Sequence, residues 1–123
     1  MTQVRHSNLN WQRFSLVEQL ANVGSEVDRT IRAHDSGATA RFDNALSRAL
    51  DLFDQTASDT RWSGPQRREV LRAREEFCRL FFDPTVSPES SAGIRRYFLE
   101  FAVAARGAMI GMDPMVVRER DRV

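Results

Sequence analysis

The chain has 123 residues, of which 41% are hydrophobic and 28% are charged, and its formal net charge is +1. This length suits a single domain, and this hydrophobic share is enough for a packed core, which excludes wholesale disorder. No run of about 18 apolar residues is present, so we expect no membrane span. The first residues lack the pattern of a secretory signal, so we expect a cytoplasmic location.

All 18 basic residues are arginine, because the chain contains no lysine. Two explanations stay open. One is a GC-rich genome, whose codons favour arginine, and the other is selection for guanidinium groups, which bind carboxylate and phosphate in a bidentate manner. A net charge of +1 gives no overall basic field of the kind that drives nucleic-acid binding.

The first expected helix, over residues 16–34, follows an N-terminal arm of residues 1–14. Ser15 and Glu18 have the capping-box pattern, in which each side chain accepts a hydrogen bond from the other residue's backbone amide. Gly24 interrupts this helix at the edge of its apolar stripe. Because a glycine inside a helix costs about 1 kcal/mol relative to alanine, Gly24 predicts the close approach of a neighbouring helix.

Apolar residues recur at helical spacing in three further segments, over residues 38–57, 65–82 and 88–110. The first of these begins without a sharp signal. Ser63 and Gln66 repeat the capping-box pattern around Pro65, and Ser87 precedes Pro88, a residue favoured in the first turn of a helix. No segment alternates apolar and polar residues at period two, so we expect no strand.

These segments predict an all-α fold, an antiparallel up-down four-helix bundle over residues 15–110. The antiparallel order is expected because the connections between the long amphipathic helices are short. Residues 111–123 should form a short C-terminal tail or an extra helical turn. The tail is rich in methionine, which suits adaptable contact surfaces, so it either folds back over the bundle or contacts a partner. The candidate partner contacts are Met109, Met112, Met115 and Val116.

The residues that carry catalysis or bind metals are few. The two histidines, His6 and His34, do not lie in the Glu-x-x-His motif that binds iron in four-helix bundles. The single cysteine, Cys78, excludes an internal disulfide and lies among apolar residues, where a thiol is usually inert. No phosphate loop, nucleophile elbow or dinucleotide fingerprint is present. We therefore expect no enzyme activity, no metal site and no cofactor.

Arg74 departs from this plain pattern, because it falls at the centre of the apolar stripe of segment 65–82. An unpaired guanidinium in a core is costly, so Arg74 should meet a carboxylate or reach water between two helices. Two interpretations stay open: a buried ion pair that fixes the register of the helices, and a residue that binds an anion in a groove. The candidate partners are Asp28, Asp51, Asp54 and Glu100.

Other arginines lie on the solvated side of the same segment. Arg72 and Glu76 are spaced for an ion pair across one helical turn, and so are Glu75 and Arg79, which predicts a ladder of salt bridges. The alternative for such a face is a track that contacts phosphate groups. The candidate nucleic-acid contacts are Arg67, Arg68, Arg72, Arg95 and Arg96.

The size, the four helices and the arginine-bearing faces, with segments 11–15 (Trp-Gln-Arg-Phe-Ser) and 71–75 (Leu-Arg-Ala-Arg-Glu), resemble a group of small bacterial four-helix bundles. These are related to the ribosomal-RNA intervening-sequence proteins and include the accessory bundles of diversity-generating retroelements. The resemblance covers the architecture of residues 15–110 and transfers no functional residue. It implies an oligomeric, non-enzymatic bundle that contacts RNA or a reverse transcriptase, although a net charge of +1 departs from that group's basic character.

The function expected from the sequence is therefore that of a non-enzymatic interaction module, which forms a homo-oligomer or docks on a protein partner. The alternative is a nucleic-acid-binding accessory subunit that uses the arginine-rich helix faces. The low net charge favours the first function over the second.

Overall fold

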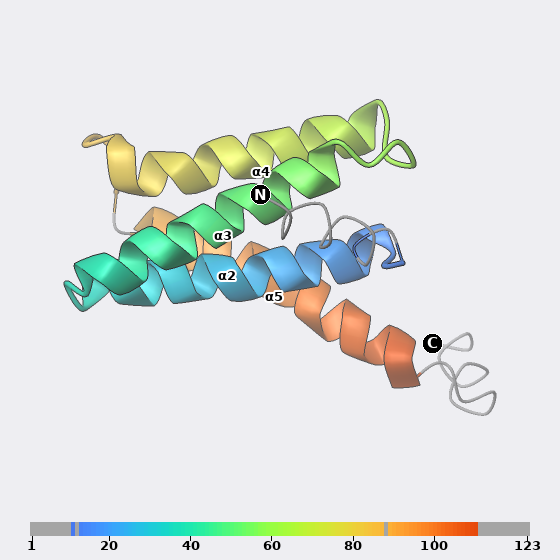
Figure 1. The fold of residues 1–123 in the computed structure, drawn as a ribbon, viewed down its shortest axis with the longest axis horizontal. Coiled ribbons are helices and arrows are strands. Elements are labelled where there is room, and N and C mark those ends of the chain that lie inside the picture. Colours follow the sequence, from blue (N-terminus) through green and yellow to red (C-terminus); the bar gives the residue numbers. More distant parts are fainter. Residues whose placement is uncertain (1–10, 12, 88, 111–123) are drawn as a thin grey trace.

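A computed structural model describes residues 11, 13–87 and 89–110 of the chain (Figure 1). This part of the chain contains four helices and no strand, which confirms the all-α prediction. The helices are α2 (Leu16–Asp35), α3 (Thr39–Ala57), α4 (Pro65–Phe82) and α5 (Glu89–Ile110). Every observed boundary lies within one residue of the expected one.

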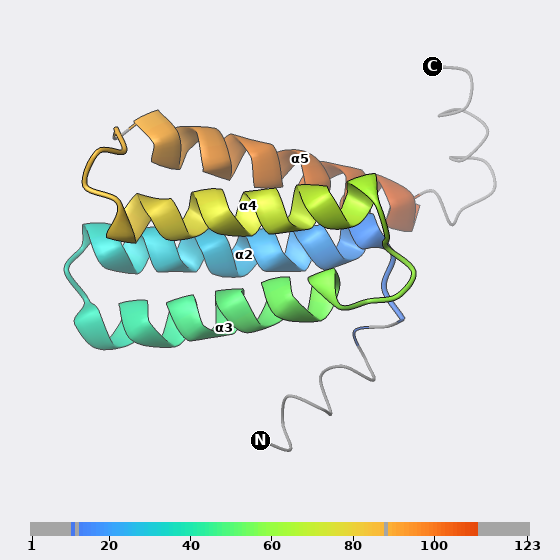
Figure 2. The same cartoon turned by 90° about the horizontal axis from the view of Figure 1, so that it is seen from above.

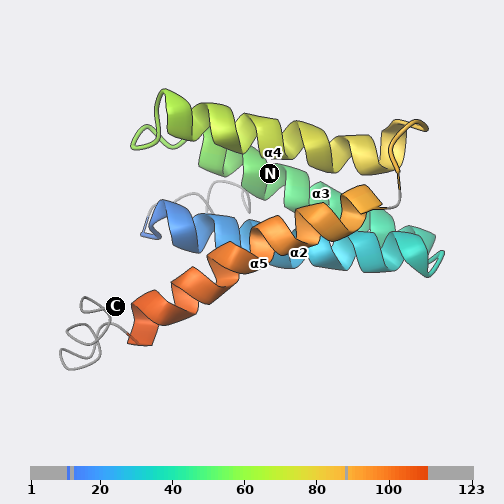
Figure 3. The same cartoon turned by 180° about the vertical axis from the view of Figure 1, so that it is seen from behind.

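The helix α2 holds the assembly together, because it packs extensively against both α3 and α5. The helix α4 packs less closely against its two neighbours, α3 and α5. Figure 2 shows short loops joining successive helices at alternate ends of the bundle. The helix α5 crosses α2 at an angle, and its C-terminal half extends beyond the other three helices (Figures 1 and 3).

Two of the expected capping boxes lie in the described residues, and one of them differs from the prediction. The capping box before α2 is confirmed, since Ser15 Oγ accepts from the Glu18 amide at 3.2 Å and the Ser15 amide donates to Glu18 Oε1 at 2.8 Å. The second predicted box is wrong. The N-cap of α4 is Gly64 with a φ of 60°, a conformation that glycine adopts readily, and no side chain caps this helix. The start of α5 involves Pro88, which lies outside the described residues.

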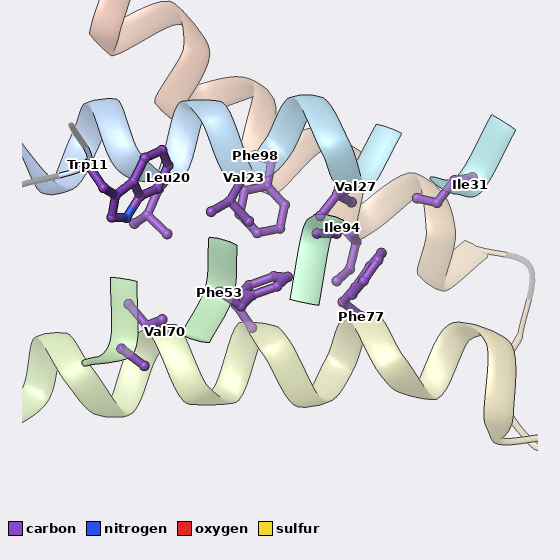
Figure 4. Close-up of a cluster of buried hydrophobic side chains, with 13 residues drawn as sticks. Trp11, Leu20, Val23, Val27, Ile31, Phe53, Val70, Phe77, Ile94 and Phe98 are labelled. Carbon is purple, nitrogen blue, oxygen red and sulfur yellow. The ribbon is translucent and has the colours of Figure 1, made fainter. Parts of the chain in front are cut away.

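Large apolar side chains from all four helices meet in one core (Figure 4). Phe53 of α3 lies at its centre, with ring centroids 5.6 Å from Phe77 of α4 and 5.9 Å from Phe98 of α5. All three rings are buried, and burial of each such side chain contributes about 1.5–3 kcal/mol. Phe53 thus contacts helices on two sides of the core.

Gly24 lies where α5 crosses α2. A Cβ atom built on Gly24 would lie 2.7 Å from the Cβ of Phe98, closer than two carbon atoms approach without displacement. The close approach of a neighbouring helix that Gly24 predicted is therefore confirmed.

The N-terminal arm contributes to the core, contrary to the expected boundary at residue 14. The Trp11 side chain is buried, and its Nε1 donates a hydrogen bond of 3.0 Å to Thr56 Oγ1 near the end of α3. The packed core therefore includes Trp11. The ring covers one end of the core, and burial of its large apolar surface stabilises it there.

A buried polar cluster closes this end of the bundle. The fully buried Gln19 donates to the Trp11 carbonyl at 2.9 Å and to Asp59 Oδ2 at 3.0 Å, and it accepts from Trp62 Nε1 at 2.9 Å. Arg61 donates to both carboxylate oxygens of Asp59, at 3.0 and 2.7 Å. These bonds join the N-terminal segment, α2 and the α3–α4 loop.

Asp59 predicts a pH dependence of the fold. Hydrogen bonds, above all those from Arg61, lower the pKa of the Asp59 carboxyl from 3.8 to about 2. Because the folded state stabilises the carboxylate, its contribution is present above about pH 4 and is lost as the pH falls towards about 2. We expect a loss of about 2 kcal/mol in the free energy of unfolding across this range. Urea denaturation at a series of pH values measures it, and an Asp59→Asn variant should lack this part of the dependence.

Candidate functional site

A hollow of about 530 Å³ lies between α2 and α3, and we name it the α2–α3 hollow. The small side chains of Ala33 and Ala45, both buried, form part of its lining, together with Ser36 and Asn44. No carboxylate of the described residues lines it. Four arginines, two from each helix, complete the lining: Arg29, Arg32, Arg41 and Arg48.

Two carboxylates of α2 hold three of these arginines. Glu26, whose side chain is largely buried, accepts from Arg29 at 2.6 Å and from Arg48 at 3.3 Å. Asp28 accepts from Arg32 at 2.9 Å. Glu26 thus pairs with one arginine from each helix, and both guanidinium groups stay largely exposed to solvent.

Positive charge exceeds negative charge on this side of the protein. Asp28 also accepts from Arg95 of α5 at 2.7 Å, so two guanidinium groups share it, as two share Glu26. Arg41 makes no ion pair within the described part of the chain. Four arginines line the hollow, and the carboxylates paired with them are Glu26 and Asp28, which leaves an excess of positive charge there.

The five arginines that the sequence proposed as nucleic-acid contacts do not form one surface. Arg95 and Arg96 line a second hollow, between α2 and α5, whereas Arg72 lines a third, between α4 and α5. Arg67 uses its Nε to donate to the Ala57 carbonyl at 2.9 Å, and Arg68 is exposed on α4. Because these residues divide between two sides of α5, no single surface favours the nucleic-acid alternative through them.

The arginines that line the hollow between α4 and α5 are already held in ion pairs. Arg72 is paired with Glu69 and with Glu76, so the predicted Arg72–Glu76 pair is present. The Tyr97 hydroxyl donates to Glu69 Oε2 at 2.6 Å, and burial together with this bond raises the pKa of Tyr97. The bonds from Arg72 and Tyr97 lower the pKa of Glu69. Neither group is suited to act as a base here, since Tyr97 stays protonated and Glu69 has two donors already.

Arg74 meets one of its expected partners, but the pair is not buried. Its Nε lies 2.9 Å from Asp54 Oδ1, and the side chains are 34% and 61% exposed. The inward side of α4 is formed by Val70, Ala73 and Phe77, so Arg74 lies about 100° away from Ala73, at the edge of the core. The expected burial of this ion pair is therefore corrected.

The other carboxylates named with Arg74 make no ion pair with it within the described residues, although Asp51 lines a hollow together with Arg74 and Asp54. Asp51 accepts from Gln55 Nε2 at 3.2 Å, and Glu100 is exposed on α5. In the expected ladder on α4, Arg79 pairs with Asp83 at 3.2 Å, and its pairing with Glu75 is not among the contacts of the described residues.

The outer side of α5 exposes large apolar side chains. Leu99 and Val103 are 56% and 54% exposed, and because they are one helical turn apart they share a face. Residues 101–105 are all apolar, so this part of α5 has no polar side. We name Leu99 and Val103 the α5 apolar face.

The tail residues proposed as partner contacts cannot be placed. Met112, Met115 and Val116 lie outside the described residues, and so does the side chain of Met109, although its backbone belongs to α5.

Metal and redox chemistry find no support in the described residues. No group of three histidine, cysteine or acidic side chains there could hold a metal ion, and none of the four helices is both long and apolar enough to cross a membrane. Burial raises the pKa of the Cys78 thiol, which keeps it protonated and unreactive.

Comparison of the chain with protein-family models, curated proteins and solved structures finds no match.

Proposed function

We propose that the protein is a non-enzymatic interaction module, an up-down antiparallel bundle that forms a homodimer through the α5 apolar face. The observation that carries the proposal is the exposure of Leu99 and Val103 on one side of a helix that extends beyond the bundle. Burying such a side chain completely contributes about 1.5–3 kcal/mol, and because Leu99 and Val103 are already nearly half buried, contact adds about half of that for each.

A second copy of the chain is the partner that the charges favour. Arg96 and Glu100 lie one turn apart beside Leu99, and neither makes an ion pair within the described residues. In a twofold contact, residue i of one copy meets residue j of the other and the reverse also holds. Antiparallel packing of two α5 helices thus brings Arg96 of each copy towards Glu100 of the other, which makes the face complementary to itself.

Leu99→Asp should convert a dimer to a monomer. A carboxylate placed in an apolar contact loses the burial of leucine and must be desolvated, so we expect dimer affinity to fall at least about 30-fold. Sedimentation equilibrium over a range of concentrations measures it. Leu71→Asp on α4 is the control, because Leu71 is also exposed, at 39%, and should leave the dimer intact. A wild-type chain that stays monomeric at every concentration would exclude the proposal.

Charge exchange tests the twofold geometry itself. The variants Arg96→Glu and Glu100→Arg should each dimerise less well alone, because like charges then meet across the contact. An equimolar mixture of the two should form heterodimers, since both facing pairs become opposite in sign. If the mixture dimerises no better than either variant, Arg96 and Glu100 do not face each other.

A further inference from the structure

The arginines of the α2–α3 hollow converge on one space from two walls. Arg29 and Arg32 are three residues apart on α2, and Arg41 and Arg48 are seven residues apart on α3, or about 10 Å along the helix axis. Arginines that come from two helices can contact a compact anion from two sides at once. The hollow therefore has the form of a site for a short anion with several charges.

The guanidinium groups retain donors for such an anion. Each has five N–H donors in a planar fork, and the ion pairs to Glu26 and Asp28 use only some of them. Arg41 has no ion pair within the described residues, and Ser36 and Asn44 add neutral polar groups. Phosphate oxygens match this fork in a bidentate manner, which adds geometric specificity to the charge.

Glu26 links arginines from both walls of the hollow. Its carboxylate pairs with Arg29 of α2 and with Arg48 of α3, which brings one guanidinium group from each helix towards the other. The hollow thus presents guanidinium donors from two helices with an excess of positive charge.

We propose that the α2–α3 hollow binds the phosphate chain of a compact polyphosphate, either inorganic triphosphate or a nucleoside triphosphate. None of the lining residues is aromatic, so the hollow offers no platform on which a base could stack. The phosphate chain is therefore the recognised part of either ligand. Arg29 and Arg32 also line the hollow between α2 and α5, which Leu99 of the α5 apolar face lines too, whereas Arg41 does not.

Calorimetric titration of the full-length chain with inorganic triphosphate at low salt tests the proposal. We expect one site per chain, and an Arg32→Gln/Arg41→Gln variant should bind at least about tenfold more weakly, because charged hydrogen bonds are lost from both walls. The control variant Arg13→Gln/Arg68→Gln removes the same two charges from exposed positions outside the hollow, and its affinity should stay within about twofold of wild type. Thermal unfolding of each variant confirms that it is folded.

Further titrations separate the sources of the phosphate chain. Equal affinity for inorganic and nucleoside triphosphate supports recognition of the phosphate chain alone, and binding of one of them only assigns the site to that source. Absence of saturable binding to both ligands overturns the proposal, and so does an equal loss of affinity in the control variant. Tighter binding of a short RNA duplex, reduced equally in both variants, also overturns it, because the positive charge would then act as a diffuse surface.

Discussion

Replacing Asp59 by alanine is expected to lower the free energy of unfolding by about 3 kcal/mol, near the low end of the range for breaking a buried ion pair. The buried Asp59 carboxylate accepts from Arg61 and from Gln19, and the substitution removes both bonds. Gln19 is then left in the core with the Trp11 carbonyl as the one acceptor of its amide nitrogen. Arg61 is partly exposed and turns to water, which keeps the loss from being larger.

Urea denaturation at neutral pH measures this loss, and the melting temperature should fall by roughly 10–20 °C for a unit of this size. The matched control is Asp54→Ala, which removes the same charge from the exposed pair with Arg74 and should cost less than about 1 kcal/mol. If the two substitutions destabilise the protein equally, the cluster around Gln19 does not stabilise this end of the bundle.

The helices were predictable because their signals are local. Ser15 and Glu18 begin α2 through contacts between residues three apart, and apolar periodicity continues each helix without reference to the rest of the chain. Gly24 is a less direct case. Its energetic penalty within a helix implies a compensating contact, and the structure identifies that contact as Phe98.

The polar cluster was not predicted, because it joins residues that are far apart in the chain. Gln19 and Trp62 are separated by 43 positions, and neither residue taken alone identifies the other as its partner. One local signal was available: Gln19 lies four residues before Val23 and so occupies the apolar stripe of α2. A polar residue in that stripe indicates a buried hydrogen-bond network, but its partners depend on the tertiary arrangement.

Arg74 and the α2–α3 hollow also depend on the tertiary arrangement. The position of Arg74 was misjudged because Ala73, a small residue, sets the inward direction of α4 together with Phe77. The α2–α3 hollow could not be predicted at all, since Arg32 and Arg41 belong to different helices and face one space only when those helices pair. Sequence periodicity defines the face of each helix, and the packing decides which faces meet.

Gly24→Ala is expected to destabilise the protein by about 1–2 kcal/mol, although alanine favours the helix by about 1 kcal/mol. The new methyl group would lie 2.7 Å from Phe98 Cβ, an atom fixed to the backbone of α5, so the whole helix must move. That movement separates Phe98 from Phe53 in the core. Chemical denaturation of the variant measures the change.

Gly93→Ala on α5 is the comparison that isolates the contact. A Cβ at Gly93 meets no atom within 4 Å, so this substitution should stabilise the protein by up to about 1 kcal/mol through helix propensity alone. Helix propensity favours alanine over glycine at both positions. If the free energy of unfolding falls for Gly24→Ala and rises for Gly93→Ala, the difference must come from the close contact between α2 and α5 at Gly24. Stabilisation by both substitutions would instead mean that the two helices separate at little cost, and the orientation of the α5 apolar face would then not be fixed by Phe98.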